Sequence, residues 1–325
     1  MTKNLKFSHK ILLAAALVVA VAFTCFVLFN DYRQRQSLRS DTQTSLQDLG
    51  SLTAGNIRNW LDSRVQVLDS LAQQVAVDGP GKPSLDRALA LPVYANNFQL
   101  SYFGGQDGSM QSVPAGNRAA DYDPRQRGWY KAATAANQTI VTEPYISASA
   151  GKLVITLATP VQQGGRLLGV SGVDTDLQTI SKLINALDFD GNGHAFIVNG
   201  EGKIMIHPKP ELALKTLADL FPGDTPQISS GLKEVEFDGR KQFINFTHVD
   251  GISSVDWYVA LVLDQDAAFA MLGELRTSAA VATLIAIIAI IALLGLLIRV
   301  LLQPLHAMGR AMRDIAEGEG DLTRR

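Results

Sequence analysis

Side chains suited to holding a charged ligand gather in two short segments of this 325-residue chain. Tyr122, Trp129 and Tyr130 lie in the first segment, and Asp174 and Asp176 lie in the second. Asp174 ends an apolar, strand-like run, and a buried acid requires a partner. If the strand continues, the two carboxylates point to one face and converge on one cavity, where they repel each other. A cationic ligand relieves that repulsion, and each aromatic face adds cation–π attraction of about 0.5–2 kcal/mol, so these residues predict a site for a cation.

Structural roles compete with binding in the first segment. Asp123 before Pro124 is typical of a helix N-cap with proline at the first helical position. Gln126 would then complete a capping box. Trp129 and Tyr130 are also residue types that fill hydrophobic cores.

Two further roles are ambiguous from the residues. Asp176 precedes a predicted helix and is a candidate cap for it, while Thr175 with Gln178 offers a competing capping box. Arg127 has two candidate partners, a ligand carboxylate or, in an empty pocket, Asp174.

A long helix, followed by two segments with the same order of predicted helices and strands, must position these residues. We call these two segments the first and the second round. Apolar residues at spacings of three and four predict a helix over residues 33–77, which the Gly- and Pro-rich run after it ends. The first round predicts a hairpin around Gly104–Gly108, a helix from Asp123, strands at Thr139–Ile146, Lys152–Val161 and Leu167–Val173, and a helix at Leu177–Leu187. The second predicts a hairpin around Gly200–Gly202, a short helix over Leu212–Leu220, and strands at Lys233–Phe237, Lys241–Val249 and Trp257–Asp264. We therefore expect an α+β fold with two tandem antiparallel-sheet modules, at residues 98–188 and 190–265.

Two uncharged apolar runs bracket this region, at residues 11–30 and 277–298. Each has about the 20 residues needed to cross a bilayer, so we predict two transmembrane helices. Lysines in residues 1–10 and arginines in residues 299–325 place both ends in the cytoplasm and residues 31–276 outside. A cleaved signal peptide is the alternative for the first run, but no small-residue cleavage site follows it. The single cysteine, Cys25, lies in this run, so the outer region has no disulfide.

This organisation resembles the double Cache sensor domain of bacterial methyl-accepting chemotaxis proteins over residues 31–276. Residues 299–325 resemble the start of a HAMP relay, marked by Pro304 and the run Glu317–Leu322. The resemblance implies a receptor of the bacterial inner membrane with a periplasmic sensor, and we expect a homodimer. In that family a signalling hairpin follows HAMP and contacts a histidine kinase and an adaptor. We expect this chain to be the N-terminal part of such a receptor.

The resemblance also implies a ligand pocket. The family's amino-acid-binding motif falls on Tyr122, Arg127, Trp129 and Tyr130, and Tyr145 and Asp174 follow. In that motif the arginine and tryptophan hold a carboxylate, and the tyrosine and aspartate hold an amino group. A second acid at Asp176 resembles the amine-binding variant. We therefore expect a small amine such as a polyamine or histamine, bound in the first module while the second mainly transmits, with an L-amino acid as the alternative ligand.

Other function classes find little support in the sequence. P-loops, dinucleotide fingerprints and nucleophile elbows are absent, so we expect no enzyme activity. A net charge of -2 gives no electrostatic case for nucleic acid. The histidines lack metal-ligand spacing, and we expect neither a metal nor a cofactor. A sensor histidine kinase or diguanylate cyclase with the same input half is the rival that the sequence leaves open.

Overall fold

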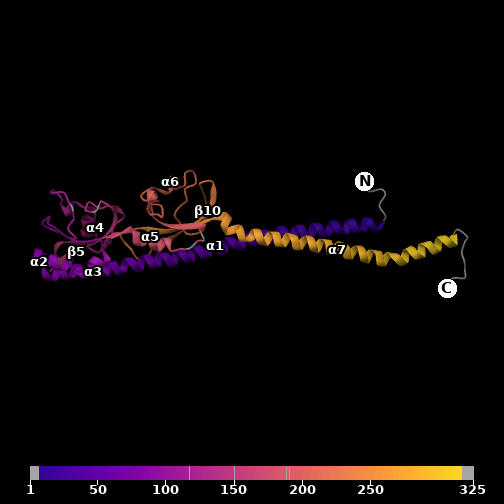
Figure 1. Ribbon diagram of the computed structural model, residues 1–325, viewed down its shortest axis with the longest axis horizontal. Helices are drawn as coiled ribbons and strands as arrows, with labels where there is room; N and C mark the ends of the chain where they lie inside the picture. Colours follow the sequence, from indigo (N-terminus) through magenta and orange to yellow (C-terminus); the bar gives the residue numbers. More distant parts are fainter. Residues whose placement is uncertain (1–6, 117, 150, 188, 190, 317–325) are drawn as a thin grey trace. The chain divides into compact units, whose positions relative to one another are not determined.

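The computed structural model describes residues 7–116, 118–149, 151–187, 189 and 191–316. The chain folds into two compact units. One unit contains the residues up to Ser40 and those from Phe269 onward, and the other contains Asp41–Ala268. Figure 1 follows the chain from one terminus to the other.

Long apolar helices make up the unit that contains the chain ends. α1 (Phe7–Asp78) carries the first apolar run, and α7 (Gln265–Ala316) carries the second. The most apolar windows of Lys10–Asp78 and Ala280–Leu301 have mean hydropathies of 2.9 and 3.1, and no residue of either window is buried inside the protein. A helix that is apolar all round and open to its surroundings is typical of a membrane span. The described part of the chain thus has two candidate membrane helices. The predicted HAMP run Glu317–Leu322 lies outside the described residues.

The part of α1 beyond Ser40 is the spine of the other unit. Its buried side chains include Ile57, Leu61, Leu68 and Val75, which recur at spacings of four and seven and so share one face of the helix. The predicted helix over residues 33–77 is confirmed, and it continues without a break from the apolar run. The helix ends at Asp78, where Gly79 adopts a φ of +80°, a left-handed conformation that glycine takes without strain.

The first sheet has six strands, in the order β2-β1-β6-β5-β3, with β4 paired to β5. Every pairing in it is antiparallel. Its strands are β1 (Leu100–Gly105), β2 (Met110–Val113), β3 (Ile140–Val141), β4 (Tyr145–Ile146), β5 (Leu153–Gln163) and β6 (Arg166–Asp176). The helices of this part are α2 (Lys82–Leu89), α3 (Pro92–Asn97), the 3-10 turn η1 (Pro124–Gln126), α4 (Gly128–Ala136) and α5 (Leu177–Asn185).

The second sheet repeats that arrangement with the order β8-β7-β11-β10-β9. Its elements are β7 (Gly193–Asn199), β8 (Ile204–Ile206), η2 (Pro210–Leu212), α6 (Leu217–Leu220), β9 (Lys233–Phe237), β10 (Arg240–His248) and β11 (Trp257–Asp264). Strands β7, β8, β9, β10 and β11 occupy the places of β1, β2, β3, β5 and β6. The prediction of an α+β fold with two related antiparallel modules is therefore confirmed (Figure 1).

Short elements differ most from their predictions. The single strand expected over Thr139–Ile146 is two short strands, β3 and β4, which both pair with β5. Between them the strand is interrupted over residues 142–144, although Thr142 N still donates to Thr156 O at 2.9 Å. The helix expected over Leu212–Leu220 begins only at Leu217, where Thr216 and Asp219 form a capping box. Leu214, just before it, has a φ of +66°, which no helical residue adopts.

Candidate ligand-binding site

A buried carboxylate lies at the centre of the first module. Asp174, near the end of β6, is 3% exposed. Its Oδ1 accepts hydrogen bonds from the hydroxyls of Tyr102 at 2.9 Å and Thr156 at 2.6 Å. Its Oδ2 accepts one from Ser147 Oγ at 3.2 Å. A carboxylate has about four acceptor sites, so these three hydroxyls leave Oδ2 able to accept a further donor.

The sheet register explains why these hydroxyls meet Asp174. Thr156 on β5 is the direct antiparallel partner of Asp174, which places the two side chains on one face. Tyr102 on β1 pairs with Gly172, and a Cβ at Gly172 would lie 2.2 Å from the Tyr102 ring. Glycine is thus required there for the Tyr102 ring to cross β6 and reach the carboxylate.

Burial governs the ionisation of this cluster. It raises the pKa of Asp174, and the hydrogen bonds from Thr156, Tyr102 and Ser147 offset part of that shift. It also raises the pKa of Tyr102 and Tyr145, with the Asp174 charge adding to both shifts. Tyr145 joins the network because its hydroxyl lies 2.7 Å from Thr156 Oγ1. The cavity therefore presents a desolvated acid whose charge an incoming cation would stabilise.

Aromatic and cationic residues close the cavity around Asp174. The Trp129 ring packs edge-on against Tyr102 with centroids 5.0 Å apart. The Arg127 guanidinium lies over the Tyr122 ring, 5.5 Å from its centroid. Within the described part of the chain, no hydrogen bond or ion pair involves that guanidinium. The cavity is small, about 10 Å³, and is lined by Tyr102, Met110, Tyr122, Arg127, Trp129, Tyr145, Ser147, Ala148, Ser149 and Asp174.

A second guanidinium, that of Arg118, lies beside the cavity residue Ser149 and is not among the predicted site residues. Its Nε donates to Ser149 Oγ at 3.0 Å, and its Cζ lies 5.6 Å from the Tyr122 ring centroid. Its Nη2 is buried and has no hydrogen-bond partner among the described residues. The Arg118 charge is close enough to lower the pKa of Asp174. No spacing rule marks Arg118, because it lies in an irregular loop that only the tertiary fold brings against Ser149, a residue that lines the cavity.

Two residues of the predicted site lie outside this cavity. Tyr130 is 6% exposed and packs in the hydrophobic cluster with Leu100 and Ala133, the core role considered as an alternative. Asp176 is the N-cap of α5, where its Oδ1 accepts from Gln178 N at 2.7 Å and its Oδ2 from Gln99 Nε2 at 2.9 Å. The two carboxylates therefore do not converge on one cavity, because the chain turns from β6 into α5 at Asp176.

The Asp123 cap is confirmed, without its capping box. The Asp123 carboxylate accepts from Arg125 N at 2.9 Å and so caps η1. Gln126 does not reach back to Asp123. Its Oε1 accepts instead from Lys131 Nζ at 3.1 Å. Arg127 then begins α4 as its N-cap residue, which places the Arg127 and Trp129 side chains beside the cavity.

Comparison with known proteins identifies the family of the region between the two apolar runs. Residues 34–272 match the Cache domain family. The chain is 60% identical over 323 residues to the methyl-accepting chemotaxis protein PscA of Pseudomonas syringae pv. tomato, covering 99% of this chain and 51% of that protein.

Solved structures agree with this assignment. The ligand-binding domain of the Pseudomonas aeruginosa PAO1 amino acid chemoreceptor PctB, in complex with L-Arg, is 42% identical with a TM-score of 0.68; the match covers 71% of this chain and 99% of that one. The corresponding domain of PctC from the same strain, in complex with GABA, is 44% identical with a TM-score of 0.65, covering 69% and 100%.

A double-module sensor region flanked by two candidate membrane helices defines the input half of a membrane receptor. The chain belongs to the Cache domain family, and over its whole length it is similar to methyl-accepting chemotaxis proteins. It spans about half the length of the curated relatives that it matches.

Proposed function

We propose that this chain is the sensor part of a chemoreceptor and binds an L-amino acid or a close analogue in its first module. The observation that carries the proposal is the charge arrangement at the cavity. One buried carboxylate, Asp174, faces a region where two guanidiniums, those of Arg118 and Arg127, make no ion pair with any described residue. A zwitterionic ligand carries an ammonium that complements Asp174 and a carboxylate that complements the two guanidiniums.

Each end of the ligand then has a defined partner. The ligand ammonium donates to the remaining acceptor site of Asp174 and lies near the rings of Trp129 and Tyr145. The ligand carboxylate accepts from Arg127 and from the buried Nη2 of Arg118. Hydrogen bonds of this kind join two charged groups and are stronger than neutral ones.

A carboxylate-free amine, the ligand first expected, fits this arrangement less well. That expectation relied on paired acids, and Asp176 caps α5 instead of lining the cavity. An amine would bring no carboxylate to either guanidinium. The solved relatives described above hold L-Arg and GABA, ligands that carry both an amino group and a carboxylate, so they support the L-amino acid alternative.

The arrangement in the membrane is proposed from the basic residues that flank the two apolar runs. The sensor lies in the periplasm of a bacterium, both chain ends lie in the cytoplasm, and the receptor acts as a homodimer in the inner membrane. The curated relatives favour a chemotaxis transducer, which reaches its histidine kinase and adaptor through a further signalling domain, over a histidine kinase or diguanylate cyclase.

The test compares amino acids with the amines that lack only the carboxylate. The 325-residue chain in lipid nanodiscs is titrated calorimetrically with the L-amino acids and GABA, and with agmatine, histamine and putrescine. We expect binding of amino acids and little heat from the amines. The Arg118→Gln variant should weaken amino acid binding about tenfold or more, because a hydrogen bond to a charged group contributes about 1.5–3 kcal/mol.

Arg125→Gln is the matched control for that variant. Arg125 is in the same segment, but its guanidinium pairs with Asp123 at 2.8 Å and donates to Gln106 O, and neither partner lines the cavity. Arg118 differs because its partner Ser149 does line the cavity. Its replacement should leave affinity within about twofold, a change of less than about 0.5 kcal/mol. Tight binding of an amine with no response to any amino acid would refute the proposed ligand class.

A further inference from the structure

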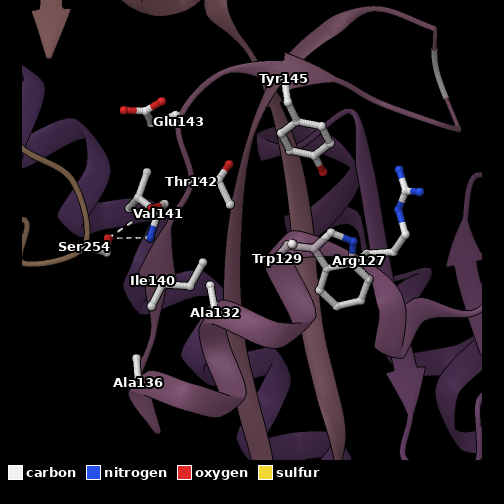
Figure 2. Close-up of a pocket in the computed structure, with 11 residues that line it drawn as sticks. Arg127, Trp129, Ala132, Ala136, Ile140, Val141, Thr142, Glu143, Tyr145 and Ser254 are labelled. Atoms are coloured by element: carbon white, nitrogen blue, oxygen red, sulfur yellow. Dashed lines mark hydrogen bonds between the residues drawn. The ribbon is translucent and has the colours of Figure 1, made fainter. Parts of the chain in front are cut away.

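An open groove adjoins the Asp174 cavity on the side of α4. Its volume is about 570 Å³, and three of its lining residues, Arg127, Trp129 and Tyr145, also line the cavity. Figure 2 shows these three side chains on one side of the groove and those of Ala132, Ala136, Ile140 and Val141 on the other. The groove and the cavity are therefore neighbours that share one wall.

Size separates the roles of the two spaces. The cavity, at about 10 Å³, holds roughly one water molecule, so of a bound amino acid only the ammonium beside Asp174 fits within it. The groove lies within the range of about 300–1,000 Å³ that is usual for small-molecule sites. An amino acid held at Asp174 and Arg127 has no room in the cavity for a large side chain. The adjoining open volume lies past Trp129 and Tyr145.

We propose that this groove receives the side chain of the ligand and selects large aliphatic or aromatic side chains. This inference rests on the proposed function, since it extends the site that holds the ammonium and carboxylate. The residues that line the groove indicate which class of side chain it binds. Ile140, Val141 and the Trp129 ring are apolar, and so are Ala132 and Ala136 on α4. Burial of apolar surface is the force that such walls supply.

The charged residue on the far side of the groove is already engaged. Glu143 Oε1 accepts from Asn199 Nδ2 at 2.7 Å, and Oε2 lies 3.9 Å from Lys203 Nζ. Its carboxylate is thus held by the second module, and a cationic side chain would have to compete for it. This arrangement favours an apolar occupant over a basic one.

Ala132 and Ala136 determine the size of the occupant. They are four residues apart on α4 and so lie on one face, and both line the groove. Because neither side chain extends beyond Cβ, the space in front of α4 stays open. Leucine at either residue would fill it while remaining a good helix former.

The experiment uses the 325-residue chain in nanodiscs, titrated with the proteinogenic amino acids. Ala132→Leu and Ala136→Leu are compared with Ala135→Leu, which alters an exposed residue of the same helix outside the groove. We expect the two groove variants to lose about tenfold or more in affinity for L-leucine and L-phenylalanine, while glycine and L-alanine change by less than about twofold. The control should resemble the unaltered chain, and thermal unfolding verifies that all variants fold.

Three results would refute the proposed side-chain site without refuting amino acid binding. These are equal losses for small and large ligands, unchanged L-leucine affinity in both groove variants, or an unaltered chain that binds only small or only polar amino acids. Each leaves amino acid binding itself intact. An unaltered chain that binds no amino acid refutes the proposed function and, with it, the side-chain site.

Discussion

Replacing Asp174 by asparagine separates ligand binding from folding. Asparagine has nearly the same shape, and its side-chain oxygen can still accept from Tyr102 and Thr156, as Oδ1 does in the native protein. The Ser147 hydroxyl, which donates to Oδ2, can instead accept from the new amide. The hydrogen-bond network therefore survives, and the negative charge is lost.

The expected loss of affinity follows from that charge. A hydrogen bond between charged groups is worth about 1.5–3 kcal/mol, and each 1.4 kcal/mol is tenfold, so Asp174→Asn should weaken amino acid binding by roughly ten- to a hundredfold. Stability should not fall at neutral pH. Burial raises the pKa of Asp174, which means that its charged form is disfavoured in the folded protein, and a neutral amide avoids that cost.

The pH dependence gives an independent readout. Protons compete with the ligand ammonium for Asp174, so affinity should fall as the pH drops through the raised pKa of this carboxyl, above its usual 3.8. The effect on folding has the opposite sign. Because the folded protein binds this proton more tightly than the unfolded chain, the Asp174 contribution to stability increases as the pH falls toward 3.8.

Titration calorimetry and thermal unfolding at several pH values measure both effects. Asp174→Asn should remove this acid-dependent loss of affinity as well as weaken binding. A variant that binds as tightly as the native chain, or that unfolds at a much lower temperature without a change in affinity, would show that Asp174 is a structural acid and refute the reasoning.

Two further substitutions test the assignments outside the cavity. Asp176→Ala should lower the free energy of unfolding by about 1 kcal/mol, because α5 loses its cap, and should leave ligand affinity within about twofold. A tenfold loss of affinity in titration calorimetry would show that Asp176 contributes to ligand binding. His207 is buried, its Nδ1 accepts from Lys209 N at 3.0 Å, and its Nε2 has no partner among the described residues. Burial, aided by the nearby His194 and Lys209, lowers the pKa of His207 to about 4. The unfolded chain therefore binds this proton first, and stability should decline between about pH 6.5 and 4, by at most about 2 kcal/mol after allowance for solvent screening. His207→Gln should flatten that decline in unfolding midpoints measured across this range, and an unchanged slope would assign it to other groups.

The elements with long periodic patterns could be predicted from the sequence. The spacing of Leu61, Leu68 and Val75 on α1 identifies one buried face, and the repeated order of hairpin, helix and strands indicates two related modules. The first signal is a short-range spacing and the second is a repeated order of elements, so a single sequence is enough to detect both. Short pieces such as η2 and α6 lack enough residues for a period, and tertiary contacts decide their conformation.

The candidate site was predictable only where sequence neighbours share a cavity. Arg127 and Trp129 flank one turn and reach the cavity together. Asp174 and Asp176 show the limit of the same argument: the i, i+2 rule holds within a strand, and β6 ends at the second of these residues. Arg118 could not be found, because its role depends on a loop conformation that no local pattern encodes.

The segment between β3 and β4 connects the site to the second module. Tyr145 lines both the cavity and the groove. Four residues earlier, Val141 N donates to Ser254 Oγ at 2.8 Å and Ser254 Oγ donates to Val141 O at 3.0 Å, the two bonds drawn in Figure 2. Glu143, between them, is bound by Asn199 of β7. A ligand that moves Tyr145 therefore pulls on a chain segment that the second module holds at two points. Because packed interfaces have discrete arrangements, we expect such a pull to shift the second module as a body, the behaviour predicted for a module that mainly transmits.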